Sequence, residues 1–274
     1  MKTTQFKSAF ILSGLVAVLA LIVSVLGLFT GLYRDNPLVT AAWRGNDLVT
    51  LGVVVPILGL SLWLARRGSA AWLLIWCGSM VYMLYNYVFY VYGAFFNAAF
   101  PLYILLVALS LWALILSLPR LDADGLRRRF TPRTPVVWIA ILMLLIPVIM
   151  GSIEILQLAG FYATGVVPEA ITKTGHPTGV VYATDLAFLM PVIVVGAIWL
   201  LQRKAWGYIL ATVVMFKGVT YPLALVAMVI YSLAAGTGYD ELLPFYLFFF
   251  VCSSIGLGLL IKNLPSGDQT GKAG

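Results

Sequence analysis

The chain is dominated by long runs of apolar residues separated by short polar segments. Each run holds roughly 20 residues or more, the length that a helix needs to cross about 30 Å of hydrocarbon. This pattern predicts an all-α, polytopic membrane protein with eight transmembrane helices. The predicted spans cover residues 8–33, 46–65, 70–94, 99–118, 135–162, 183–202, 206–235 and 243–262.

The composition agrees with this prediction. Of the 274 residues, 62% are hydrophobic and 10% are charged, whereas soluble domains average about a quarter charged residues. The strands of a β-barrel would alternate in polarity, and these runs do not. The apolar run that follows Lys7 is too long for a signal peptide and is not closed by a small-x-small cleavage site, so we interpret it as an uncleaved first span.

The basic residues predict the orientation. Thirteen Lys and Arg fall in segments on the N-terminal side of the membrane, and three (Arg34, Arg44 and Lys173) fall on the other side. Because cytoplasmic loops carry the excess of Lys and Arg, both termini should be cytoplasmic. This topology explains the net charge of +7 without a nucleic-acid partner.

The two halves of the sequence resemble one another. Similar features recur in the same order, at offsets of about 130 to 143 residues: Arg66-Arg67 with Trp72 and Arg203-Lys204 with Trp206, Pro101-Leu102-Tyr103 and Pro244-Phe245-Tyr246, Asp47-Leu48 and Asp185-Leu186, Pro56 and Pro191. We predict two parallel four-helix repeats, related by an axis along the membrane normal. The predicted organisation is a first repeat (1–118), a basic cytoplasmic linker (119–134), a second repeat (135–264) and a disordered tail (265–274).

Two ionisable residues lie deep inside predicted spans. Lys217 is roughly 16 Å from the inner interface, and Glu154 is roughly 12 Å from the outer one, at 1.5 Å per helical residue. Both therefore lie near the middle of the membrane, where a charge is expensive, and pairing would lower the cost of each. The pair is either a structural link between two spans or part of a ligand or proton site. A third possibility is that both side chains reach separately toward water.

Pro222 strengthens the second interpretation. It has no N–H, so the carbonyl group of Gly218, beside Lys217, loses its helical partner. Transporters use such weakened helices to build binding sites, although proline kinks are also ordinary packing devices in membrane helices.

The third span carries an aromatic and polar stripe. Its members recur at helical spacing: Tyr82, Tyr85, Asn86, Phe89 and Tyr92. They form either a packed face with hydrogen bonds between helices or one wall of a ligand cavity. The candidate ligand-binding residues are Lys217, Glu154, Tyr82, Tyr85, Asn86 and Tyr221.

The remaining acids near span ends fit a structural role. Asp47 and Asp185 open predicted spans, and Asp240 precedes the last one, so each is expected to cap the free N–H groups of a helix. His176 lies in the long outer loop and is interpreted as an ordinary loop residue.

Sequence motifs argue against an enzyme. The chain has no phosphate loop, dinucleotide glycine pattern, metal-spaced His/Cys cluster or nucleophile motif. Cys77 and Cys252 lie within spans and are interpreted as small apolar residues. We predict no catalytic residue, cofactor or metal, and the expected partners are membrane lipids and an unknown small molecule. The oligomeric state does not follow from the sequence.

Two short stretches resemble a bacterial family of multi-pass membrane proteins with no assigned function. They are Tyr182-Ala183-Thr184-Asp185-Leu186 with Pro191 and Leu200 to Tyr208, and Tyr92-Gly93 through Asn97 to Tyr103. The resemblance implies a bacterial cytoplasmic membrane and no activity. A lysine in the seventh span is also similar to that of retinal-binding rhodopsins, but the span count fits poorly and the third span has no acid as counter-ion.

These observations lead to two functional hypotheses. In the first, the protein binds, and translocates, a small or lipid-like molecule at the Glu154/Lys217 site. In the second, it is a membrane scaffold or sensor subunit that transports nothing, and the charged pair is structural.

Overall fold

The computed structural model describes residues 3–265, and every regular element in this part of the chain is helical. The predicted tail, except for Pro265, lies outside the described residues, as do Lys2 and Lys272 of the charge count.

Eight helices of the described chain are long and apolar enough to cross a membrane. Four of them belong to the first half: α1 (Lys7–Phe29), α2 (Pro37–Val49) continuing through η2 (Thr50–Val54) into α3 (Val55–Arg66), α4 (Ala70–Tyr92), and α5 (Phe100–Ser117) with η3 (Leu118–Arg120). The other four are α7 (Val136–Ile146) continuing through η4 (Pro147–Gly151) into α8 (Ser152–Thr164), α10 (Val180–Thr184) continuing through η5 (Asp185–Leu189) into α11 (Met190–Leu201), α12 (Ala205–Ala234), and α13 (Leu243–Lys262). Short helices are η1 (Thr3–Phe6), α6 (Ala123–Arg129) and α9 (Glu169–Thr172). The prediction of an all-α protein with eight spans is confirmed.

The second span begins earlier than predicted. The helix starts at Pro37 rather than near residue 46, because Asn36 caps it by accepting a hydrogen bond from the backbone N–H of Val39 at 3.0 Å. A proline in the first turn suits this start, since its missing N–H would have no helical partner there. The prediction that Asp47 caps the span is therefore wrong, because Asp47 lies inside the helix. The first span ends at Phe29, four residues before the predicted end.

Three spans contain a π-helical segment next to a proline. Pro147 begins η4, Pro56 follows η2 by two residues, and Pro191 follows η5 by two residues. A proline inside a helix leaves a carbonyl group without its usual donor, and a π-helical turn changes the pattern of donors locally. Such turns often occur at functional sites, and here η5 begins at Asp185.

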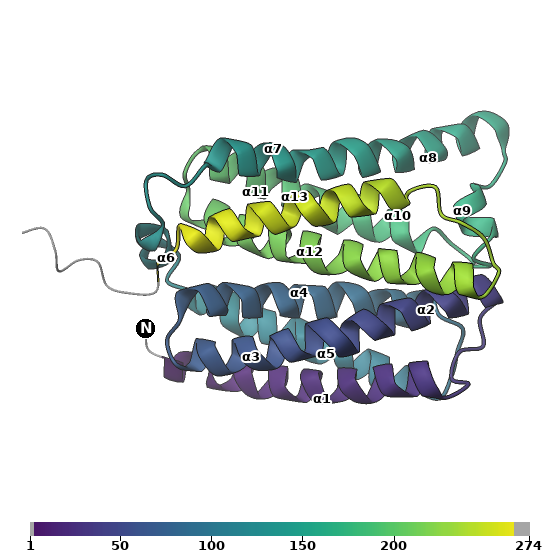
Figure 1. The fold of residues 1–274 in the computed structure, drawn as a ribbon, viewed down its shortest axis with the longest axis horizontal. Helices are drawn as coiled ribbons and strands as arrows, with labels where there is room; N and C mark the ends of the chain where they lie inside the picture. The colour runs from purple at the N-terminus through teal and green to yellow at the C-terminus, as the bar shows by residue number, and fades with distance from the viewer. Residues whose placement is uncertain (1–2, 266–274) are drawn as a thin grey trace, which may run out of the picture.

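The two halves of the chain lie side by side (Figure 1), and the contacts within each half join its four spans into a ring. In the first half α1 contacts α3 and α5, and α4 contacts the same two helices; in the second half α7 contacts α11 and α13, and α12 contacts the same two. The equivalent neighbours agree with the predicted repeat, but the duplication itself stays a prediction. The two rings are joined mainly by α12, which packs against α2 and α4.

Glycines allow this close approach of α12. A side chain at Gly45 in α2 would collide with the backbone of Ala227 and Met228 in α12. A Cβ atom at Gly78 in α4 would lie 2.8 Å from the ring of Phe216 in α12. Small residues at helix contacts are the usual way for membrane helices to gain packing contacts in the absence of a hydrophobic driving force.

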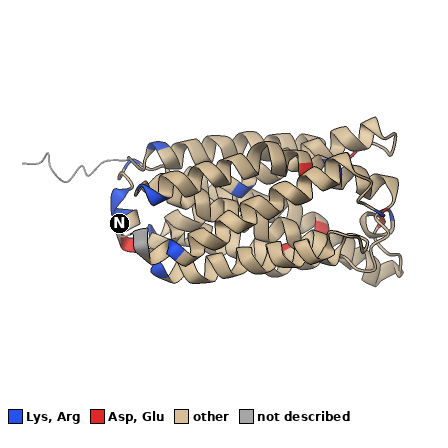
Figure 2. Ribbon diagram, turned by 90° about the horizontal axis from the view of Figure 1, so that it is seen from below, with Lys and Arg blue, Asp and Glu red and all other residues tan. Residues whose placement is uncertain are grey.

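Charges are distributed unevenly along the bundle (Figure 2). Most Lys and Arg positions gather at the end where the chain begins, whereas most Asp and Glu positions lie in the other half. The apolar outer surface between the two ends identifies a multi-pass membrane protein.

We expect Gly45→Ala to lower the stability of the folded protein by roughly 1–3 kcal/mol, because the new methyl group overpacks the contact between α2 and α12. Thermal unfolding of the detergent-solubilised protein would measure this. Gly59→Ala is the matched control, since a Cβ at Gly59 in α3 meets no atom within 4 Å. Equal unfolding temperatures for the two variants would contradict the close packing at Gly45.

Candidate functional site

A cavity of about 1140 Å³ lies within the second half of the protein and extends to the first. Its walls come from α2, α4, α8, α10, η5, α12 and α13, and its mouth is formed by the loops after α8 and α12. These loops lie at the end of the bundle opposite the N-terminus (Figure 1). The cavity thus runs from that end toward the mid-membrane residues of α12.

Lys217 lies at the inner part of this cavity. Its side chain is only 6% exposed, and its ammonium nitrogen lies 3.6 Å from the ring centre of Tyr85 and 4.2 Å from that of Tyr221. A cation held over aromatic faces is attracted by their quadrupoles. Helix α13 packs closely against α12 beside the lysine, since a Cβ at Gly218 would collide with Ser253 in α13. The two rings therefore supply part of what offsets the burial of this charge.

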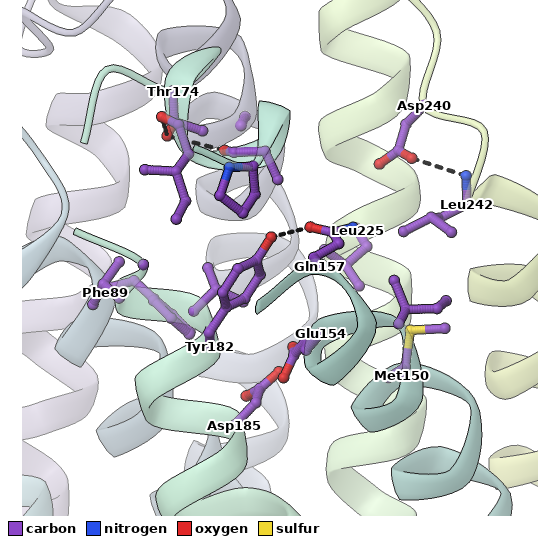
Figure 3. Close-up of a pocket in the computed structure, with 18 of the residues that line it drawn as sticks. Phe89, Met150, Glu154, Gln157, Thr174, Tyr182, Asp185, Leu225, Asp240 and Leu242 are labelled. Carbon is purple, nitrogen blue, oxygen red and sulfur yellow. Dashed lines mark hydrogen bonds between the residues drawn. The ribbon is translucent and has the colours of Figure 1, made fainter. Parts of the chain in front are cut away.

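Two carboxyl groups meet in the same cavity. Glu154 in α8 and Asp185 at the start of η5 are 7% and 9% exposed. Figure 3 shows their carboxyl groups facing one another below Tyr182. Asp185 accepts a hydrogen bond from the hydroxyl group of Tyr85, whereas one carboxyl oxygen of Glu154, Oε2, has no hydrogen-bond partner. The cavity therefore contains both signs of charge.

The predicted ion pair between Glu154 and Lys217 is not formed. Within residues 3–265, the one pair of opposite charges closer than 4.0 Å is Lys173 with Glu169, in the outer loop. Lys217 is held by aromatic rings instead, and Glu154 faces Asp185. The prediction of a direct pair is wrong because helix spacing gave the depth of each residue but not the direction in which its side chain points.

Asp185, like Asp47, lies inside its span and not at the start predicted from the sequence. It was expected to cap a helix, but α10 adds five residues before it, so Asp185 lies within the span and makes no cap. The nearby Pro191 is the sequence feature that could have indicated an irregular helix at Asp185, since Pro191 also lies inside the span. Asp240 accepts the backbone N–H of Leu242 at 2.9 Å just before α13 (Figure 3). No side chain caps α13 itself, so the capping role predicted for Asp240 is wrong.

The predicted aromatic stripe divides between two environments. Tyr85, Asn86 and Tyr221 line the cavity together with Lys217 and Glu154. Tyr82 lies outside the cavity lining and bonds with Thr50 at 3.0 Å in a buried network of the first half. Tyr92, at the end of α4, is 67% exposed and does not continue the stripe into the protein.

The first half contains a third buried acid, Asp47, which is not part of the lining of this cavity. Asp47 is 1% exposed and accepts hydrogen bonds from the hydroxyl groups of Tyr33 and Tyr90. Asn46 links this group to the cavity. Its side-chain nitrogen, Nδ2, donates to the hydroxyl group of Tyr90 and to the side-chain oxygen Oδ1 of Asn86, each at 2.8 Å. A chain of hydrogen bonds therefore connects the buried acid to the cavity wall.

The outer loop forms one side of the mouth. Asn36 holds it to the start of α2 by donating to the carbonyl oxygens of Lys173 and Thr174, at 3.0 and 3.2 Å. His176 lines the mouth, and burial lowers the pKa of its imidazole although the nearby Asp35 acts in the opposite direction. The loop is therefore attached to the bundle rather than separate from it.

The fold and this cavity define a multi-pass helical membrane protein with a largely apolar, aromatic-walled cavity that reaches Lys217 in α12. Comparison with models of known protein families, with curated proteins and with solved structures finds no match to this chain. In residues 3–265, no group of three or more His, Cys, Asp or Glu side chains is arranged to hold a metal ion.

We expect a double-mutant cycle to assign the stabilising contact of Lys217 to the aromatic rings. Lys217→Met combined with Tyr221→Leu should show a coupling free energy of about 0.5–2 kcal/mol, the usual range for a cation over an aromatic ring. Lys217→Met with Glu154→Gln should show a smaller coupling, because these side chains are not in contact. Unfolding of the three single variants and the two double variants in detergent would measure both coupling free energies.

Tyr221→Phe is the control in this cycle, since it keeps the ring and removes only the hydroxyl group. A larger coupling with Glu154 than with Tyr221 would show that the charged groups stabilise one another.

Proposed function

We propose that this protein binds, and moves across the membrane, a small or lipid-like molecule in its mid-membrane cavity. The observation that carries the proposal is the gathering of Lys217, Glu154, Asp185, Tyr85 and Tyr221 around one cavity of about 1140 Å³. Small-molecule sites are typically concave and mostly apolar, with a few convergent polar groups. Ionisable residues inside a membrane are costly and usually mark a functional site.

The packing of α8 supports movement of the ligand as well as binding. Glu154 is its one buried residue, and its apolar side chains Ile155 and Leu156 are 57% and 70% exposed. A helix held by few contacts opens at a low free-energy cost. A shift of α8 relative to α12 would widen or close the cavity around Glu154.

The alternative function, a scaffold or sensor subunit that transports nothing, rested on a structural ion pair. Without that pair, Glu154 keeps a buried carboxyl oxygen that has no hydrogen-bond partner, an arrangement that gives no structural benefit. The cavity therefore favours binding over the scaffold. No reaction is proposed, because no nucleophile and base are positioned together among the described residues.

The location and orientation complete the proposal. The resemblance to bacterial multi-pass proteins suggests the bacterial cytoplasmic membrane. The excess of Lys and Arg at the N-terminal end suggests that this end is cytoplasmic. The mouth of the cavity would then open on the outer side.

We expect native mass spectrometry of the purified wild-type protein to reveal a co-purifying small molecule or lipid. Gly160→Trp should lower its occupancy severalfold, because Gly160 lines the cavity and a side chain there meets no protein atom within 4 Å. The indole ring would therefore occupy space that belongs to the ligand.

Gly59→Trp is the control for this variant. Gly59 also has open space around it, but it lies in α3, away from the cavity lining. The bound mass should persist in this control. Equal occupancy in the two tryptophan variants would place the molecule outside the cavity, and no bound mass in any variant would favour the scaffold.

The orientation predicts which loops a membrane-impermeant maleimide reaches in intact cells. In a Cys252→Ser background, where Cys77 is fully buried, Val166→Cys in the outer loop should react from outside. Arg128→Cys in α6 should react only after the membrane is permeabilised. The reverse pattern would place the N-terminal end outside.

A further inference from the structure

The cavity contains two polar atoms that are buried and have no partner. One carboxyl oxygen of Glu154, Oε2, lacks a donor, and the amide nitrogen of Asn86, Nδ2, lacks an acceptor. Both residues line the cavity, and Asn86 is only 1% exposed. Leaving such groups unsatisfied is costly, so each one indicates what a ligand would supply. Glu154 needs a donor, and Asn86 needs an oxygen.

The charge of Lys217 is partly compensated without a ligand. Its ammonium group lies over the rings of Tyr85 and Tyr221, at 3.6 and 4.2 Å. Aromatic faces attract a cation. Lys217 can therefore remain an internal charge of the protein, in contrast to the anion-holding role that its position in the sequence suggests.

The balance of charge in the cavity favours a cation. The carboxyl groups of Glu154 and Asp185 face one another (Figure 3). Two acids in this arrangement repel when both are ionised, unless a positive charge offsets the repulsion. A ligand with one positive charge beside them would supply that offset, whereas an anion would add to the repulsion.

Aromatic rings surround the two carboxyl groups. Tyr85 packs edge-on against Phe89 with ring centres 4.8 Å apart, and Tyr182 lies above the carboxyl pair with its hydroxyl group bonded to Gln157 (Figure 3). Aromatic faces attract ammonium groups, most strongly where water is excluded. An apolar body next to the ammonium group would fill the rest of the largely apolar cavity.

We propose that the ligand is an amphipathic amine, whose ammonium group is bound beside the carboxyl groups of Glu154 and Asp185 and whose oxygen accepts a hydrogen bond from Asn86. This inference rests on the proposed function and specifies the chemical class of the ligand. The ammonium donates to the unsatisfied oxygen of Glu154. The ring of Phe89 and that of Tyr182 pack against the apolar part.

Three probes of similar shape, each with a phenol oxygen for Asn86, test the charge preference: tyramine, 4-hydroxyphenethyl alcohol and 3-(4-hydroxyphenyl)propionate. Isothermal titration calorimetry with the wild-type protein in lipid nanodiscs should show that the amine binds about tenfold or more tightly than the alcohol, and that the carboxylate binds most weakly. Glu154→Gln should remove the preference for the amine. Asp124→Asn, which neutralises an exposed acid at the opposite end of the bundle, should keep it.

Asp185→Asn serves as the second variant if Glu154→Gln does not fold, and the same loss of preference is expected. Tightest binding of 3-(4-hydroxyphenyl)propionate, abolished by Lys217→Met, would overturn the amine and return the anion-holding role to the lysine. Failure of all three probes to bind the wild type would also overturn it. The co-purifying mass described above tests the binding function separately, so the two failures are distinguishable.

Discussion

The cost of placing charge in hydrocarbon is the constraint on which this structure depends. An isolated ammonium group at the membrane centre costs at least a few kcal/mol. The protein offsets that cost for Lys217 with the faces of two tyrosine rings and with the nearby carboxyl groups of the cavity. These groups come from α4, α8, η5 and α12, so the burial of one charge requires helices from both halves of the chain to meet.

This requirement explains why α12 is central to the bundle. It contacts α11 and α13 in its own half and α2 and α4 in the other. Glycines at the contacts with α2 and α4 let the backbones approach, and Gly218 lets α13 cover the turn beside the lysine. The same helix therefore joins the halves and carries the charge, which couples the stability of the bundle to the cavity.

The two acids that the predicted repeat places at corresponding positions have different surroundings. Asp47 is enclosed by hydroxyl groups from Tyr33 and Tyr90, whereas Asp185 faces the cavity and a second acid, Glu154. One acid is satisfied by its surroundings, and the other retains the capacity to bind. This difference concentrates the proposed binding site in the second half, while the hydrogen bonds through Asn46 keep the buried network in contact with the cavity wall.

The sequence by itself determined the helical membrane fold, the eight spans and the depth of Lys217 and Glu154, because hydrophobic length and helical rise depend only on local residues. Only the tertiary structure decided which side chains meet. A helix can rotate about its axis without changing its hydropathy. Packing therefore decided that Lys217 contacts two tyrosine rings, that Glu154 faces Asp185 and that Tyr82 lies outside the cavity lining. The short helix α10 that precedes Asp185 was likewise not predicted from hydropathy. Its Tyr182 bonds to Gln157 in α8, whereas Thr184 bonds to Val180 within α10.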